Sequence, residues 1–196
     1  FGLTTDLHLF IYAGWQLGLA ESADKLLINF SEIKPTHMNA VPRVFYIIYD
    51  KIQQSVAADP EKKKIFDAAV AEAVKNRDLK EKTEEFKFYD AVAFSTVRNI
   101  FGGQLKQVVS GGALIKPEIA LFFSDVGLPT YNGYGLSETS PVISNNGPKR
   151  GNKYGTVGKA YKDTKIVIDK SNVGADSPDG EIVVYGAQVM QGYHNK

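Results

Sequence analysis

The sequence has 196 residues, of which 43% are hydrophobic and 23% are charged, proportions that are ordinary for a globular protein able to bury a core. Its formal net charge is only +1, with basic and acidic residues interspersed, so no nucleic-acid partner is predicted. The absence of cysteine excludes disulfides, thiolate nucleophiles and zinc–thiolate sites, and it is consistent with a reducing, cytoplasmic location.

The first half of the sequence predicts mostly helices. Apolar residues recur at helical spacing over residues 41–56, and again over residues 65–74 after the start signal Asp59-Pro60-Glu61. A third helix is predicted from a charged start at residues 80–85 to a stop at Gly102-Gly103. Its predicted inner face consists of Tyr89, Val92, Ala93, Thr96, Val97 and Ile100.

The second half predicts shorter elements that alternate in type. Residues 105–109 predict a strand, residues 117–126 a helix, and the residues from 129 onward a second strand, which together make a β-α-β unit. Two further β-branched runs, residues 165–169 and 181–185, also predict strands. The predicted fold class is therefore α/β.

The loops that follow the two strands of the β-α-β unit carry the candidate site. Ser110-Gly111-Gly112-Ala113 follows the first strand, where glycines let backbone amides approach a ligand. Residues 132–140, which follow the second strand, combine two glycines, an aromatic ring, three hydroxyls and the Glu138 carboxylate. A ring can stack on a base, and a lone carboxylate suits Mg²⁺. A right-handed crossover would place both loops at the carboxyl ends of adjacent parallel strands, and we expect a nucleotide and magnesium site there.

Residues 135–139 also resemble the G-x-S-x-G nucleophile elbow of α/β hydrolases, with Ser137 in the place of the nucleophile. Thr139 stands where the elbow has its last glycine, and the only later histidine is His194. A hydrolase therefore remains an alternative that the motif itself supports poorly.

Four motifs in order resemble those of the adenylate-forming enzymes. Residues 108–113, VVSGGA, resemble the Ser-Gly-Gly-Ala adenine loop of that family, and residues 134–139 resemble its Tyr-Gly-x-Thr-Glu motif, with serine in the threonine place. Residues 155–159 are similar to its Gly-x-Val-Gly-Lys segment. Residues 180–186, followed by Gly192-Tyr193, are similar to its Gly-Glu-x-x-x-x-Gly and Gly-Tyr segment.

Three further segments look most like the long-chain fatty-acyl-CoA synthetase branch: residues 21–26, Lys34-Pro35-Thr36 and residues 41–45. The resemblance implies a reaction in two steps. A carboxylate attacks the α-phosphate of ATP and releases pyrophosphate, and the thiol of coenzyme A then displaces AMP. The implied partners are a fatty acid, ATP or AMP with Mg²⁺, and coenzyme A. A hydrophobic substrate of this kind would favour peripheral membrane association.

The resemblance also implies a role for each matching position. The implied cofactor-binding residues are Gly111, Gly112, Ala113, Asn132, Gly133, Tyr134 and Gly135. Within this set, Tyr134 would stack on the adenine and Asn132 would lie near its edge. Ser137 would hydrogen-bond the α-phosphate, and Glu138 would bind Mg²⁺; these two are the implied catalytic residues.

Several parts of the family's active site have no match in the sequence. The missing parts are the Gly/Ser/Thr-rich phosphate loop, the aspartate that holds the ribose, the hinge and the lysine of the small C-terminal domain. Residues 1–196 are therefore expected to be a fragment of one AMP-binding domain, within the large N-terminal domain of an acyl-CoA synthetase. Residues 1–103 would be its mostly helical part, and residues 104–196 the β-α-β unit with further strands. Such a fragment is expected to be inactive by itself, and a non-catalytic adenylate-binding module is the alternative.

Overall fold

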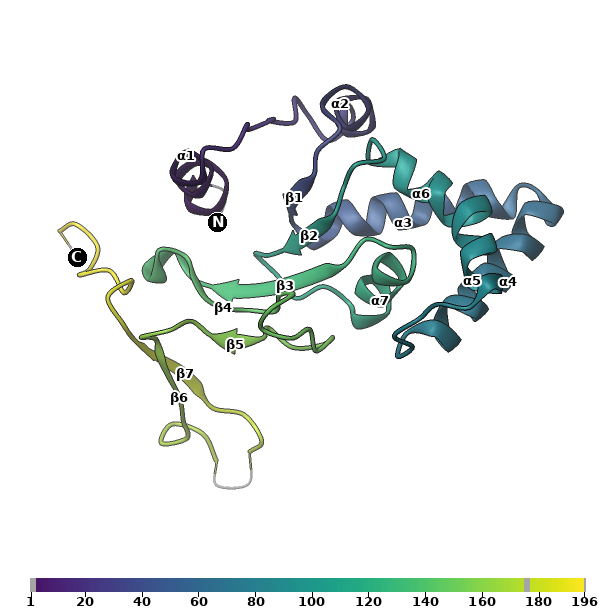
Figure 1. The fold of residues 1–196 in the computed structure, drawn as a ribbon. Helices are drawn as coiled ribbons and strands as arrows, with labels where there is room; N and C mark the ends of the chain where they lie inside the picture. The colour runs from purple at the N-terminus through teal and green to yellow at the C-terminus, as the bar shows by residue number, and fades with distance from the viewer. Residues whose placement is uncertain (1–2, 175–176, 196) are drawn as a thin grey trace.

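The computed structural model describes residues 3–174 and 177–195, and it confirms the α/β class (Figure 1). The strands are β1 (His37–Ala40), β2 (Gln107–Ser110), β3 (Thr130–Gly135), β4 (Val142–Asn145), β5 (Lys159–Ala160), β6 (Lys165–Asp169) and β7 (Glu181–Tyr185). The α-helices are α1 (Leu9–Ala13), α2 (Leu26–Ile33), α3 (Pro42–Ala57), α4 (Pro60–Asn76), α5 (Glu84–Tyr89), α6 (Ser95–Ile100) and α7 (Pro117–Asp125). Two π-helical turns, η1 (Leu3–His8) and η2 (Asp90–Phe94), and a 3₁₀ turn, η3 (Ser137–Thr139), complete the set.

The main sheet has five strands in the order β1-β2-β3-β4-β5. The first three are parallel, and β4 and β5 continue the sheet in antiparallel pairing. Helix α7 is the crossover between the parallel neighbours β2 and β3, which confirms the predicted β-α-β unit. The strands β6 and β7 form a separate two-stranded hairpin, which extends away from the sheet (Figure 1).

One hydrophobic core joins the parallel strands to the helices that follow them. Met38 of β1 and Val108 of β2 lie opposite each other and belong to the same buried cluster as Phe45 of α3 and Phe123 of α7. The rings of Phe45 and Phe123 meet edge to face, with centroids 5.5 Å apart. The sheet face that carries Met38 and Val108 is therefore the face that packs against α3 and α7.

Helices α4 and α5 each begin at a side chain that caps the first turn. Asp59 caps α4 by accepting hydrogen bonds from the N–H groups of Glu61 and Lys62, at 3.0 and 3.2 Å, and Pro60 occupies the first helical position. Thr83 caps α5 through a 3.1 Å bond from Phe86 N–H to its hydroxyl oxygen.

None of the described helices is long and apolar enough to cross a bilayer.

The predicted third helix differs from the observed one in two ways. It begins at Glu84, after the Thr83 cap, so residues 80–82 lie outside it. Its middle is the π-helical turn η2, and the predicted inner residues Val92 and Thr96 are exposed whereas Phe94 is fully buried. A π-turn takes more residues than an α-turn, so it shifts which side chains face the core. The prediction of this inner face, which assumed regular α-helical spacing, was wrong at these positions.

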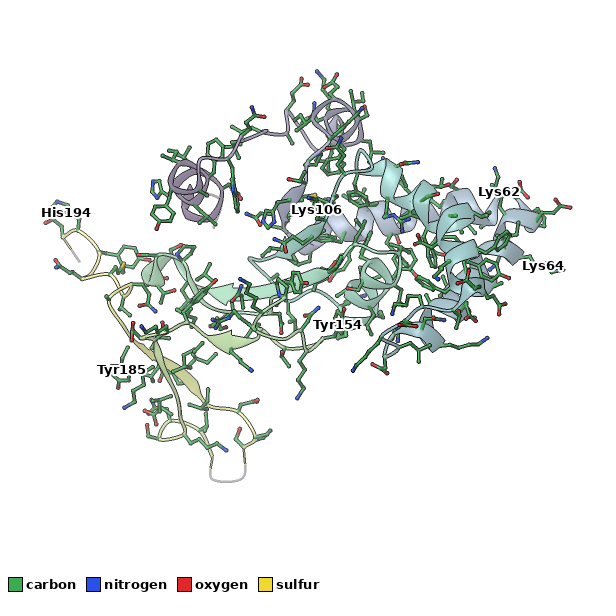
Figure 2. The ribbon with its side chains drawn as sticks, viewed as in Figure 1. Lys62, Lys64, Lys106, Tyr154, Tyr185 and His194 are labelled. Carbon is green, nitrogen blue, oxygen red and sulfur yellow. The ribbon has the colours of Figure 1, made fainter. Side chains whose placement is uncertain are left out.

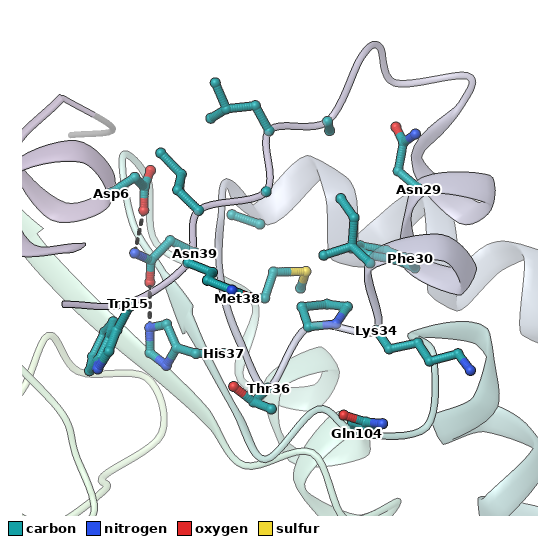
Figure 3. A pocket seen from close by; sticks show the side chains of 18 of the residues that line it. Asp6, Trp15, Asn29, Phe30, Lys34, Thr36, His37, Met38, Asn39 and Gln104 are labelled. Carbon is teal, nitrogen blue, oxygen red and sulfur yellow. Dashed lines mark hydrogen bonds between the residues drawn. The ribbon is translucent and has the colours of Figure 1, made fainter. Parts of the chain in front are cut away.

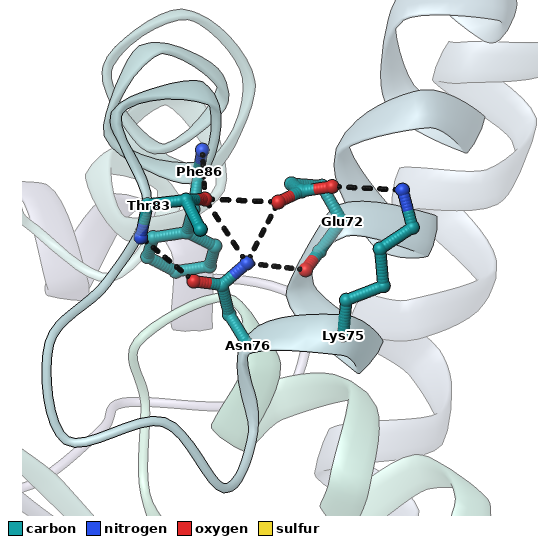
Figure 4. Close-up of polar contacts among 5 residues, drawn as sticks. All are labelled: Glu72, Lys75, Asn76, Thr83 and Phe86. Carbon is teal, nitrogen blue, oxygen red and sulfur yellow. Dashed lines mark hydrogen bonds and ion pairs between the residues drawn. The ribbon is translucent and has the colours of Figure 1, made fainter.

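A polar network joins the end of α4 to the start of α5 (Figure 4). Glu72 is buried, and its carboxylate accepts hydrogen bonds from Lys75, Thr83 and Asn76, at 3.0, 2.9 and 2.8 Å. Asn76 in turn accepts from Thr83 N–H at 2.9 Å. The contacts with Lys75, Thr83 and Asn76 hold the pKa of the Glu72 carboxyl below its ordinary value. Thr83 thus serves both as a helix cap and as a partner of a buried carboxylate.

Replacing Thr83 with alanine is expected to lower the free energy of unfolding by about 1–2 kcal/mol, because the cap of α5 and a donor to Glu72 are lost together. Thr83→Ser keeps the hydroxyl and should stay within about 0.5 kcal/mol of the parent. Urea denaturation at neutral pH measures both. An equal loss in the two variants would show that the methyl group, and not the hydroxyl, stabilises this junction.

Candidate functional site

The carboxyl ends of β1 and β2 lie in one row with the middle of β3, which continues three residues further to Gly135. Ala40 at the end of β1 pairs with Ser110 at the end of β2, and Ser110 pairs with Asn132 in β3. Residues 110–113 therefore begin beside Asn132, at the same edge of the sheet as the last residues of β3. This confirms the prediction that the two loops follow adjacent parallel strands, which is where open α/β sheets bind ligands.

The loop after β2 presents two accessible backbone positions. Gly111 is buried, and its N–H donates to the carbonyl of Ala40 at 3.2 Å, so this amide is already used within the sheet. Gly112 and Ala113 are exposed. Gly112 has a φ of 82°, in the left-handed region that favours glycine, so the turn itself requires this residue.

Several buried polar side chains at this edge lack a hydrogen-bond partner within the described residues. They are Ser110 Oγ, both amide atoms of Asn132, Ser144 Oγ and Asn145 Oδ1. Ser110 of β2 pairs with Asn132 of β3, and Ser144 of β4 lies opposite Tyr134 of β3. A buried polar group without a partner costs about 1–3 kcal/mol, and such groups in folded proteins are normally paired with protein, water or a ligand. These atoms are covered by the protein, so the cluster marks a place where a buried water would be stabilised at the edge of the candidate site.

The predicted loop at residues 132–139 begins inside β3, and this corrects the sequence prediction of a loop over its whole length. Asn132, Gly133, Tyr134 and Gly135 are strand residues, and Gly133 and Tyr134 pair with Asn145 and Ser144 of β4. The register shifts between Tyr134 and Gly135. Tyr134 stays half-buried, so part of its ring surface is accessible.

Gly135 is required by a close backbone approach. A Cβ atom built on Gly135 would lie 1.6 Å from the carbonyl oxygen of Pro141, whereas one on Gly133 would meet nothing closer than 3.6 Å. The two glycines of the motif thus differ in function. Gly135 lets the chain after β3 turn back tightly into β4, and Gly133 could carry a small side chain.

The chain after Gly135 forms the tight turn η3. The Leu136 N–H donates to Thr139 Oγ1 at 3.0 Å, and this hydroxyl lies 2.7 Å from the carbonyl of Pro141 and donates to it. Ser137 starts this 3₁₀ turn and is exposed. A nucleophile elbow instead places its serine between a strand and a full helix, so the observed turn does not favour the hydrolase alternative.

Glu138 is half-buried and is held by the C-terminal segment. The Tyr193 hydroxyl donates to Glu138 Oε1, and the Met190 N–H donates to the Glu138 carbonyl at 2.8 Å. The bond from Tyr193, together with one from the backbone of Glu138 itself, lowers the pKa of the Glu138 carboxyl, and the same contact raises the pKa of Tyr193. Glu138 is therefore charged at neutral pH.

The donor set fits a magnesium ion that is shared with a nucleotide. Within the described ranges, no group of three or more His, Cys, Asp or Glu residues could hold a metal by itself. Mg²⁺ is commonly bound by one or two carboxylates and completed by waters and substrate phosphates, so a single charged carboxylate beside an exposed serine hydroxyl suits it. Glu138 is the residue that would hold the ion.

A cavity of about 1250 Å³ runs along β1 on the side of α2 and the segment before it (Figure 3). Its apolar lining includes Phe10, Trp15, Leu17, Leu19, Leu26, Phe30, Ile33, Met38 and Val44. One wall carries a chain of hydrogen bonds, in which Gln107 donates to His37, His37 to Asn39 and Asn39 to Asp6. The cavity reaches Ala40, the β1 residue that pairs with Ser110.

Sequence reasoning had missed three parts of this region. It did not assign a role to Tyr193, although Gly192-Tyr193 matched a family motif. It did not predict β4, which supplies Ser144 and Asn145, or the cavity along β1. The polar pair Ser144-Asn145, directly after the β-branched pair Val142-Ile143, is the signal that could have indicated a site-lining strand.

The model of the AMP-binding enzyme family matches residues 1–194. The chain therefore belongs to the AMP-binding enzyme family, and the resemblance seen in its motifs is confirmed.

Similar curated proteins are acyl-CoA ligases. The chain is 31% identical to a long-chain-fatty-acid–CoA ligase of Mycobacterium bovis, over 90% of this chain and 29% of that protein. It is 28% identical to the peroxisomal long chain acyl-CoA synthetase 7 of Arabidopsis thaliana, over 94% of this chain and 27% of that protein. The chain thus spans less than a third of the length of these relatives.

Solved structures share the fold at lower identity. The benzoate CoA ligase of Burkholderia xenovorans matches 100% of this chain and 32% of its own, with a TM-score of 0.63 at 19% identity. The O-succinylbenzoate coenzyme A synthetase of Bacillus subtilis, solved with ATP and a magnesium ion, matches 97% of this chain and 31% of its own, with a TM-score of 0.55 at 18% identity.

Proposed function

We propose that this chain is the adenine- and metal-binding part of an ATP-dependent fatty acid–CoA ligase. In this reaction a carboxylate oxygen attacks the α-phosphorus of ATP and pyrophosphate leaves; the thiol of coenzyme A then attacks the acyl carbonyl and AMP leaves. The observation that carries the proposal is the parallel pairing of Ser110 with Asn132, which sets the loop after β2 beside residues 132–139 at the edge of the sheet where ligands bind. Residues 1–196 alone would not complete the reaction.

The positions of the chain's own residues support the roles that the family resemblance implies for them. Exposed Gly112 and Ala113 leave their backbone open beside the site, and the half-buried Tyr134 ring offers a face for adenine. Asn132 lies two residues before Tyr134 in the same strand and would lie near the edge of the base, with its amide atoms covered by the protein. Ser137, exposed at the start of η3, would donate to the α-phosphate, and Glu138 would hold Mg²⁺, which would supply positive charge opposite the departing pyrophosphate.

The cavity along β1 favours a long, apolar carboxylic acid as the substrate. Its volume of about 1250 Å³ and its aromatic and aliphatic lining suit a hydrocarbon chain, and it reaches the strand end next to Ser110. Each buried methylene contributes about 0.8 kcal/mol, so a chain that fills this space would bind more tightly than a short one.

The proposal predicts pyrophosphate exchange that depends on a carboxylic acid. In the full-length enzyme with ATP and Mg²⁺, we expect exchange with both palmitate and butyrate, and a KM for palmitate at least about tenfold below that for butyrate. Thioester should then form on addition of coenzyme A. AMP binding without any exchange would favour the non-catalytic module, and ester hydrolysis without ATP would favour the hydrolase.

A further inference from the structure

Two contacts tie the C-terminal segment to the turn η3. The Met190 N–H donates to the backbone carbonyl of Glu138, with an N···O distance of 2.8 Å, and the Tyr193 hydroxyl donates to Glu138 Oε1. Both the backbone and the side chain of Glu138 are thus held by a segment that follows it by about 55 residues. None of the roles assigned above uses Tyr193.

Packing does not explain the position of Tyr193. Its side chain is 57% exposed, so the ring buries little apolar surface, and the hydroxyl contact with Glu138 is its distinguishing interaction. Gly192, directly before it, has a φ of 148°, in the region that favours glycine, although no atom lies within 4 Å of a Cβ built there. Glycine is therefore needed at position 192 for its backbone conformation, which sets the direction of the chain toward Tyr193.

We propose that Tyr193 is a positioning residue for Glu138, holding the carboxylate in the orientation that binds Mg²⁺ together with the nucleotide phosphates. This inference rests on the proposed function. A carboxylate has about four acceptor sites on its two oxygens, so the two donors at Glu138, the Tyr193 hydroxyl and its own backbone, leave room for a cation. A neutral phenol orients the group without removing its charge, and ligating carboxylates are commonly held by such outer partners.

Metal binding without turnover tests the proposal. Mn²⁺, used as a paramagnetic substitute for Mg²⁺, is titrated into the full-length protein with ATP and without any carboxylic acid, and its Kd is measured by electron paramagnetic resonance. Tyr193→Phe removes only the hydroxyl, and it is expected to raise the Kd for Mn²⁺ about tenfold. Tyr185→Phe is the matched control. Tyr185 is 56% exposed, close to the exposure of Tyr193, but it lies on strand β7 of the hairpin and not on the C-terminal segment that carries Tyr193 and His194 (Figure 2).

Glu138→Gln and the double variant complete the experiment. If Tyr193 acts through Glu138, Glu138→Gln weakens Mn²⁺ binding and adding Tyr193→Phe weakens it no further. An unchanged or lower Kd in Tyr193→Phe, with Glu138→Gln still weakened, would overturn the positioning role and leave the proposed metal ligand intact. An unchanged Kd in Glu138→Gln would reject the metal assignment in the proposed function, and the positioning role with it.

Discussion

Gly135→Ala is expected to lower the free energy of unfolding by about 3 kcal/mol or more, because its methyl group would lie 1.6 Å from the Pro141 carbonyl oxygen. The backbone on both sides would have to move, and the β3–β4 pairing begins next to this contact. The turn η3, which carries Ser137 and Glu138, would move with it. Urea denaturation of the purified protein measures the loss.

Gly133→Ala is the matched control for this substitution. Its Cβ would be at least 3.6 Å from the nearest atom, an ordinary contact, and alanine in a strand changes stability by about 1 kcal/mol or less relative to glycine. Equal unfolding free energies for the two variants would show that Pro141 is not held against Gly135.

Glu138→Gln in the full-length enzyme is expected to lower the turnover of the adenylation step by about a hundredfold or more. The amide has nearly the shape of the carboxylate, so the fold should remain, but it is a poorer Mg²⁺ ligand. Without the metal, the charge on the departing pyrophosphate is less well stabilised. Pyrophosphate exchange over a range of Mg²⁺ concentrations measures the effect.

Glu181→Gln provides the control for a lost surface carboxylate. Glu181 is exposed on β7, and the one hydrogen bond of its side chain among the described residues comes from Asn172 at 3.4 Å, so its neutralisation should leave exchange unchanged. Exchange close to that of the parent in Glu138→Gln at limiting Mg²⁺ would count against Glu138 as the metal ligand.

The elements that sequence reasoning predicted well are those with strong local signals. The runs at residues 165–169 and 181–185 became β6 and β7 with the same bounds, because both are rich in β-branched residues. Helix α7 starts at Pro117, a residue suited to the first helical position, and the β-α-β topology followed from the order of elements.

The elements that were missed lack such signals. Strand β1 has only four residues, in which His37 and Asn39, which line the cavity, alternate with Met38 and Ala40; an alternation this short, with no β-branched residue, does not mark a strand in the sequence. The contact between Glu138 and Tyr193 joins residues 55 positions apart, and no local pattern predicts a pairing at that distance. The motifs located the site, whereas the partners that orient it depend on tertiary structure.

The separation of β6 and β7 from the main sheet makes local unfolding relevant to this site. In the described part of the chain these strands pair only with each other, and a lone two-stranded hairpin is marginally stable in water. Such a unit opens at a lower free energy than the sheet that the helices cover. The segment that bears Tyr193 follows directly after β7, so each opening of the hairpin can release the Tyr193 hydroxyl from Glu138 while the strands beneath the site stay folded.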